Sequence, residues 1–145
     1  MKPASQQNPT TLHASCVAVG NAAVLIMGTS GSGKSALALE LMALGAALVA
    51  DDRTIVTAGT DGLIASCPKP LIGIIEARFV GLLSAKPTRS APVRLVVDLD
   101  QIETKRLPKA RKIELLGHRI DLLHNPKILH FPSALLLLLK GGMIT

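Results

Sequence analysis

The segment from Gly28 to Ser35 constrains the fold of this chain more than any other segment. It reads Gly-Thr-Ser-Gly-Ser-Gly-Lys-Ser and matches the pattern G-x-x-x-x-G-K-[ST] at every defined position. Glycines let a backbone curl so that successive N–H groups surround an anion, and the positive end of a following helix strengthens such a site. The apolar run Ala22–Met27 precedes the motif, and leucines at helical spacing follow it. The pattern therefore predicts a strand, a phosphate-binding loop and a helix, in this order.

The polar residues of the motif suit phosphate chemistry. The Lys34 ammonium group is expected to reach the β- and γ-phosphates of a nucleotide, and the Ser35 hydroxyl is expected to complete the ligand shell of a Mg²⁺ ion. The alternative interpretation is a Gly/Ser-rich surface turn, which the flanking strand and helix patterns disfavour. The predicted nucleotide-binding residues are Gly28, Thr29, Ser30, Gly31, Ser32, Gly33, Lys34 and Ser35.

Two adjacent carboxylates, Asp51 and Asp52, follow the apolar run Ala46–Ala50. The stretch between this run and Ala22–Met27 suits a helical crossover between parallel strands, which brings the carboxyl ends of both strands to one edge of a sheet. We therefore expect both aspartates beside the phosphate-binding loop. One of them can approach Mg²⁺ or its waters, and the other can accept the proton of an attacking hydroxyl. The alternative is an Asp-Asp-Arg turn that merely ends a strand, and the spacing does not decide between the two.

The rest of the chain predicts a mixed α/β fold, a mixed sheet in which hairpins surround one βαβ unit. Gly20-Asn21 separates two β-rich runs and predicts a hairpin, and Asp61-Gly62 predicts a second one. A disordered tail over residues 1–11 and a single domain over residues 12–145 complete the expected organisation. The predicted strands are Leu12–Val19, Ala22–Met27, Ala46–Ala50, Arg53–Thr57, Leu63–Ser66, Ile72–Glu76, Arg94–Leu99, Ile113–Leu116 and Ile120–Leu123, and the last helix runs from Pro132 through Leu139 and ends at Gly141-Gly142.

Composition narrows the classes of partner. The chain has 145 residues, of which 16 are Lys or Arg and 10 are Asp or Glu. This net positive charge favours anionic partners or serves solubility alone. It has no Trp, no Tyr and only two Phe, so binding of single-stranded nucleic acid by aromatic stacking is disfavoured. No uncharged run suits a membrane span, and two cysteines are too few for a disulfide scaffold. We expect a cytoplasmic protein that binds neither nucleic acid nor membranes.

Other ionisable residues carry weaker signals. Glu76 closes an apolar strand and is either a metal ligand or a solvated strand end, and Arg78 is its ion-pair partner or a phosphate contact. His13 lies early in a strand and, taken alone, is more typical of a partly buried histidine than of a catalytic one. The basic residues between positions 105 and 112 predict a solvated loop first, and second a docking patch or a cation for the transferred phosphoryl group.

Together, these residues resemble one family. The order and spacing of His13, the Gly28–Ser35 loop, Val49-Ala50-Asp51-Asp52-Arg53 and Ile75-Glu76-Ala77-Arg78 are similar to those of the catalytic domain of bacterial HPr kinase/phosphorylase, over about residues 12 to 130. The resemblance implies a P-loop kinase domain whose fold is related to phosphoenolpyruvate carboxykinase. It implies ATP-dependent phosphorylation of a seryl hydroxyl on HPr, the phosphocarrier protein of the sugar phosphotransferase system. It also implies a reverse reaction in which inorganic phosphate removes the phosphoryl group and yields pyrophosphate.

The resemblance further implies roles for individual residues. Asp51 matches the proton acceptor of the phosphorylation, and His13 matches the histidine that supports this aspartate. Lys34 matches the phosphate-binding lysine, and Arg106 is the best match for a catalytic arginine on a loop. Ser35 and Glu76 match Mg²⁺ ligands. Of the two aspartates, Asp52 is the one that we expect near the metal, on the strand-end argument above and not from the resemblance.

The chain departs from the family pattern at three places. Ala14 follows His13 where a glycine is common, and Phe79 stands where Glu-x-Arg is usually followed by glycine. Phe131-Pro132-Ser133 stands where Arg-Pro-Gly-Arg-Asn, a segment associated with the reverse reaction, is usual. We expect no counterpart of the family's N-terminal regulatory domain, as in its short members.

We therefore expect a serine kinase that uses ATP and Mg²⁺ and acts on HPr or a paralogue. A nucleotide-sensing module without phosphotransfer and a small-molecule P-loop kinase are the alternatives. By analogy with the family we expect a homo-oligomer, most simply a hexamer, in which the apolar end Ile128–Leu139 is buried against a neighbour.

Overall fold

The computed structural model describes residues 9–142 and begins with the expected hairpin. β1 (Thr10–Val19) and β2 (Ala22–Met27) pair in antiparallel fashion and are joined by the predicted two-residue turn. β1 starts earlier than expected: Thr10 and Thr11, assigned to the tail from the sequence, pair with a later strand. Residues 1–8 of that tail lie outside the described residues.

Most of the remaining elements follow the sequence pattern, with boundaries shifted by a few residues. They are α1 (Lys34–Ala43), β3 (Ala47–Ala50), β4 (Arg53–Gly59), β5 (Gly62–Ser66), a 3-10 turn η1 (Lys69–Leu71), β6 (Ile74–Ala77), β7 (Gly81–Ser84), β8 (Ser90–Ile102), β9 (Arg111–Leu115), β10 (His118–Asn125) and α2 (Phe131–Gly141). The mixed α/β fold is confirmed. β7 was not expected, and the turn between β4 and β5 lies at Thr60-Asp61, one residue before the predicted position.

The sheet places several carboxyl ends of strands along one edge. The strands of its main part lie in the order β3, β1, β2, β8, β10 and β9, and β2 is parallel to β8, which is parallel to β10. β3 is antiparallel to β1, as β2 is, so β2 and β3 are parallel with β1 between them. The predicted βαβ unit is therefore present. The residues that follow β2, β3 and β8 meet at one edge.

Five strands close into a ring. The first residues of β1 pair with β4, the first residues of β8 pair with β5, and their later residues both pair with β2. The interior of this ring holds mainly small side chains, because little space remains between strands that curve back on each other. The alanines and the cysteine of β1 that face it, Ala14, Cys16 and Ala18, are all buried.

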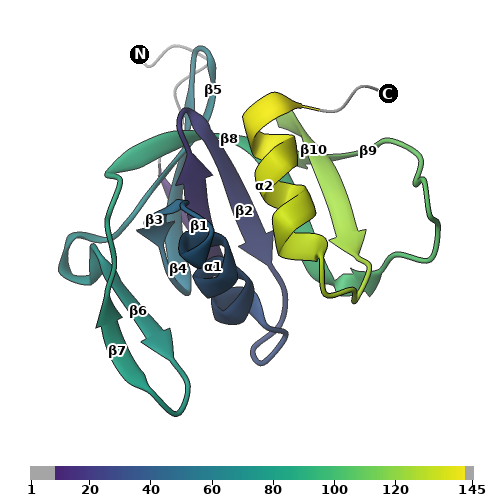
Figure 1. The fold of residues 1–145 in the computed structure, drawn as a ribbon. Coiled ribbons are helices and arrows are strands. Elements are labelled where there is room, and N and C mark those ends of the chain that lie inside the picture. The colour runs from purple at the N-terminus through teal and green to yellow at the C-terminus, as the bar shows by residue number, and fades with distance from the viewer. Residues whose placement is uncertain (1–8, 143–145) are drawn as a thin grey trace.

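A second core lies between the sheet and the two helices. Figure 1 shows α1 and α2 side by side on one face of the sheet, over β1 and β2. Side chains of β2 alternate between the two cores: Leu25 faces the ring, whereas Val24 and Ile26 pack with Leu37 and Leu41 of α1. The predicted stripe of leucines thus holds α1, and with it the loop that precedes the helix, against the sheet.

The hairpin of β6 and β7 projects from the body of the molecule (Figure 1). Its base is anchored by Ile75, which is buried in the core beneath the helices. Its tip carries Phe79 in a left-handed conformation with φ 69°, a conformation that favours glycine. No helix within residues 9–142 is long and apolar enough to cross a membrane.

Candidate functional site

The loop between β2 and α1 forms a tight turn around its own serine. The N–H of Ser32 donates to the carbonyl of Thr29 at 3.0 Å. Gly28 passes so close to Ser32 that a Cβ atom at position 28 would lie 2.4 Å from the Ser32 hydroxyl and 3.3 Å from Leu99 Cβ. Any larger residue at position 28 would therefore displace the loop.

The Ser32 hydroxyl is a buried polar atom without a hydrogen-bond partner among the described residues. Buried polar groups normally have partners, so such an atom in a loop at a helix N-terminus indicates a place for a polar ligand. The first N–H groups of α1 also have no acceptor within the helix, as at every helix start. The loop therefore offers several donors to an anion.

Lys34 lies over the beginning of the same loop. Its side chain is buried, with 6% of the residue exposed, and its ammonium group donates to the carbonyls of Gly28 at 2.9 Å and Thr29 at 3.1 Å. The positive charge is thus held at the mouth of the loop by weak, neutral acceptors. A phosphate would offer it a stronger, charge-assisted partner.

Asp51, at the end of β3, faces this loop. Its Oδ1 atom accepts hydrogen bonds from the Ser35 hydroxyl at 2.7 Å and the Ser15 hydroxyl at 2.8 Å, and Oδ2 lies 3.4 Å from the N–H of Glu76. A carboxylate against the motif's serine hydroxyl presents two oxygen ligands of the kind that Mg²⁺ prefers. The expected juxtaposition of Asp51 with the loop is present.

Asp52 points elsewhere, because the chain reverses at this residue. Asp52 has φ 66°, and the N–H of Arg53 donates to the carbonyl of Asp51 at 2.7 Å, which closes a three-residue turn. The Asp52 backbone is held by Ser15, whose hydroxyl accepts its N–H at 3.2 Å, and by Ala14, which donates to its carbonyl at 3.0 Å. A left-handed residue at this position costs free energy, and the hydrogen bonds to Ser15 and Ala14 stabilise the turn against that cost.

The consequence is that the two carboxylates diverge. Asp52 Oδ1 lies 2.6 Å from His13 Nε2, and both side chains are about half exposed. The resemblance pairs His13 with Asp51, whereas here the imidazole contacts Asp52, because the turn directs Asp51 toward Ser35 and Asp52 toward solvent and β1.

Of the remaining predicted residues, Glu76 lies beside Asp51 and Arg106 does not contact the group. Glu76 reaches Asp51 through its backbone N–H. Arg106 lies exposed on the loop between β8 and β9, and no hydrogen bond or ion pair joins it to the other candidates in the part of the chain that the structure describes. Within residues 9–142, no three His, Cys, Asp or Glu side chains form a cluster that could hold a metal. A serine hydroxyl is not among these side-chain types, so the predicted set of Ser35, Glu76 and Asp52 stays a prediction.

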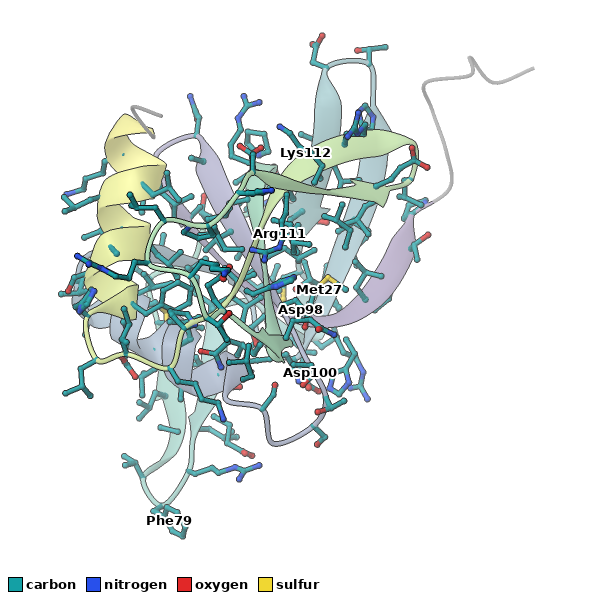
Figure 2. All side chains as sticks on the ribbon, turned by 90° about the vertical axis from the view of Figure 1, so that its right-hand side faces the viewer. Met27, Phe79, Asp98, Asp100, Arg111 and Lys112 are labelled. Carbon is teal, nitrogen blue, oxygen red and sulfur yellow. The ribbon has the colours of Figure 1, made fainter. Side chains whose placement is uncertain are left out.

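Two residues of the site were not predicted from the sequence. Ser15 is fully buried and its hydroxyl bonds to both aspartates, and the only sequence feature that pointed to it was a lone hydroxyl in the apolar run of β1. Asp100 accepts hydrogen bonds from Thr29, and the only sequence feature that pointed to it was an acidic residue just after the predicted strand Arg94–Leu99. Figure 2 shows Asp98 and Asp100 near Met27, at the end of the sheet where the loop begins.

The free thiol of Cys67 lies near the Asp51 carboxylate. Burial raises its pKa above the ordinary value, and the negative charge of Asp51 raises it further. Cys67 is therefore kept in the thiol form and is a poor nucleophile.

Known proteins resemble the chain in both sequence and fold. The family model described as HPr Serine kinase C-terminal domain matches residues 5–123. The HPr kinase/phosphorylase of Cupriavidus necator is 38% identical over 119 residues, which cover 74% of this chain and 37% of the relative. That of Xanthomonas campestris pv. campestris is 37% identical over 106 residues, covering 68% of this chain and 34% of the relative. The chain spans little more than a third of the length of these relatives.

A solved structure shares the fold. The Hpr(Ser) kinase/phosphatase from Coxiella burnetii superimposes with a TM-score of 0.74 at 24% sequence identity, covering 90% of this chain and 88% of that chain. The same mixed α/β arrangement therefore occurs in both molecules.

Proposed function

Because this chain belongs to the family of HPr serine kinase C-terminal domains, we propose that it is a kinase that transfers the γ-phosphoryl group of ATP to a seryl hydroxyl of HPr or a paralogue. The observation that carries the proposal is the junction at the carboxyl edge of β3. There the Ser35 hydroxyl lies 2.7 Å from Asp51, while Asp52 is half exposed beside His13. Phosphoryl transfer needs a site that binds the phosphates, oxygen ligands for a metal ion and an accessible carboxylate that can accept a proton.

The donors of the Gly28–Ser35 loop support the binding of the phosphates. The Ser32 hydroxyl has no partner in the described chain, and the Lys34 ammonium group rests on two neutral carbonyls that a phosphate oxygen can replace. The N-terminal end of α1 adds a partial positive charge. Together these groups would hold the β- and γ-phosphates at the N-terminal end of α1.

Ser35 and Asp51 fit a magnesium ion. They supply oxygen ligands only, and their oxygens already lie 2.7 Å apart, so both can turn toward one cation. Two protein ligands suffice for Mg²⁺, which usually completes its octahedron with phosphate oxygens and waters. When bound, the ion neutralises charge that develops on the phosphates. These contacts support Asp51 as a ligand of the ion, whereas the sequence analysis placed Asp52 there.

Asp52 is then the proton acceptor. As the seryl oxygen of HPr forms its bond to the γ-phosphorus, the bond from that phosphorus to the bridging oxygen breaks and ADP leaves with the electron pair. Asp52 takes the seryl proton, and His13 holds the carboxylate in place through its Nε2 contact. The exposure of Asp52 matters here, because a hydroxyl on another protein must reach it.

The first test is phosphoserine on HPr, located by mass spectrometry after incubation with ATP and Mg²⁺. We expect the wild-type chain and the surface control Lys140→Ala to form it and Lys34→Ala to lose at least about a hundredfold in rate, since Lys34 touches the transferred group. Equal product from wild type and Lys34→Ala would contradict the proposal. ATP binding without any phosphoserine would favour the nucleotide-sensing alternative.

The second test separates the two aspartates. Asp52→Asn is expected to lower kcat by roughly 10² to 10⁴ with ATP affinity nearly unchanged, which is the range for loss of a general base. Asp51→Asn is expected instead to raise the Mg²⁺ concentration needed for half-maximal rate. If Asp52→Asn keeps most of its turnover while Asp51→Asn loses it at saturating Mg²⁺, the original assignment of Asp51 as the base holds.

A further inference from the structure

The loop that receives the phosphates is tied to the sheet at one point outside its own motif. Asp100, near the end of β8, accepts a hydrogen bond from the N–H of Thr29 at 2.8 Å and a second from the Thr29 hydroxyl at 3.0 Å. One oxygen of the carboxylate serves each donor. We propose that Asp100 is a positioning residue that holds Thr29, and through it the phosphate-binding loop, in the shape that binds ATP. This inference rests on the proposed function and names a further residue of the same site.

The pairing of two parallel strands places Asp100 there. Met27, the last residue of β2, lies opposite Asp98 in β8. Thr29 lies two residues after Met27 and Asp100 lies two residues after Asp98, so the register that pairs β2 with β8 brings Thr29 and Asp100 together. Asp100 is itself oriented, because its N–H donates to Asp98 Oδ1 at 2.9 Å.

Thr29 transmits the contact to the rest of the loop. Its carbonyl accepts hydrogen bonds from the N–H of Ser32 at 3.0 Å and from the Lys34 ammonium group at 3.1 Å. The peptide groups on both sides of Thr29 are therefore held, one by Asp100 and the other by the residues that are proposed to grip phosphate. Loss of the Asp100 carboxylate would free the first turn of the loop while leaving the Ser32 hydroxyl and the Lys34 ammonium group in place.

The charge of Asp100 makes the inference sharply testable. A carboxylate beside a phosphate site repels the nucleotide, so if electrostatic repulsion were its only effect, removing it would tighten ATP binding. If Asp100 positions the loop, removing it weakens binding, because the loop must then be ordered at the expense of binding free energy. The two effects have opposite signs. Since Asp100 and Thr29 are both exposed, neither predicts a large change in global stability.

The experiment is a calorimetric titration with ATP and Mg²⁺, combined with thermal unfolding of each variant. Asp100→Ala is expected to weaken ATP binding roughly tenfold, the equivalent of one to two net hydrogen bonds, with a nearly unchanged unfolding midpoint. Asp100→Asn keeps an acceptor oxygen without the charge and is expected to recover most of the loss. Asp61→Ala, in the β4–β5 turn, removes the same charge from an exposed site and is the control.

A double mutant ties the effect to the contact. In a Thr29→Val background, which has lost the hydroxyl donor, Asp100→Ala is expected to cost less affinity than it does in the wild type. The inference is overturned if Asp100→Ala binds ATP as tightly as the wild type or more tightly, or if its loss of affinity is no larger than that of Asp61→Ala. It is also overturned if the loss of affinity comes with a collapse of the unfolding midpoint in both Asp100 variants. A wild-type chain that binds ATP but forms no phosphoserine contradicts the proposed kinase only; one that binds no ATP overturns both.

Discussion

At the scale of single residues, position in the turn after β3 decides the chemistry of two neighbouring aspartates. Asp51 and Asp52 are identical in type and adjacent in sequence. Asp51 nevertheless accepts hydrogen bonds from the Ser15 and Ser35 hydroxyls, whereas Asp52 contacts the half-exposed His13. The left-handed backbone at Asp52 produces this divergence. Asp tolerates such a conformation better than most residues, which suits it to this place.

Glu103 shows a different use of a carboxylate, as an anchor for the loop that carries Arg106. It accepts hydrogen bonds from the N–H groups of Thr104 and Lys105, both at 3.0 Å, and forms an ion pair with Arg111 at the far end of the loop. The Lys105 N–H is the largest cause of a lowered Glu103 pKa, to which Arg111 and Thr104 add, against a burial effect that raises it. Both ends of the loop therefore depend on one ionised side chain.

This anchor gives stability a pH dependence of known sign. A lowered folded pKa means that Glu103 stabilises the native state fully above the unfolded glutamate pKa of about 4.3, and that this contribution disappears as the pH falls through the folded value. Urea midpoints measured from pH 7 down to pH 3 should show a gap between wild type and Glu103→Gln that closes at the acid end. The exposed Glu114→Gln in β9 is the control, for which we expect little gap at either pH; a Glu103 gap that widens in acid would contradict the assignment.

At the scale of elements, the β6–β7 hairpin carries a local conflict between sequence and backbone. Phe79 is fully exposed at its tip with φ 69°, a conformation that suits glycine and is unfavourable for a bulky residue. Because the side chain touches so little, the strain is not repaid by packing.

Phe79→Gly is therefore expected to stabilise the hairpin by about 1 kcal/mol, since relief of the left-handed strain exceeds the entropy that glycine loses on folding. Slower amide hydrogen exchange in β6 and β7, together with a raised urea midpoint, would show it. Val80→Gly, also exposed but without a left-handed backbone, is the matched control and should be neutral or destabilising. Equal effects of the two substitutions would mean that the backbone of Phe79 is not strained.

At the scale of the whole molecule, the sheet serves two cores, and the helices complete only one of them. The ring of five strands encloses the first core, whereas α1 and α2 cover the second, in which Leu135 of α2 is 1% exposed. Leu137, on the same helix, is 69% exposed. The helix therefore has one face that holds the fold together and another that does not.

Leu135→Ala should accordingly lower the free energy of unfolding by about 2 to 5 kcal/mol, the range for truncating a buried leucine, whereas Leu137→Ala should change it by less than about 0.5 kcal/mol. Urea denaturation of both variants measures the difference at the same chemical change. A large loss in Leu137→Ala would indicate that this face is buried against another chain. That outcome would support the predicted oligomer, which light scattering tests directly.

The sequence by itself determined the features that depend on neighbours along the chain. The Gly28–Ser35 loop lies between its strand and its helix because glycine spacing and leucine periodicity act over a few residues. The same local signals predict the β1–β2 and β4–β5 hairpins and the helix that ends at Gly141. The geometry of a parallel crossover places Asp51 beside the loop.

Only the tertiary structure decided which distant residues meet. The register of β2 against β8 brings Asp100 to Thr29, and the pairing of β1 with β3 and β4 brings Ser15 and His13 to opposite sides of the Asp51-Asp52 turn. A shift of one residue in either pairing would exchange these contacts, since side chains alternate along a strand. Contacts of this kind are set by how separate strands are aligned in space, and no pattern within a single segment encodes that alignment.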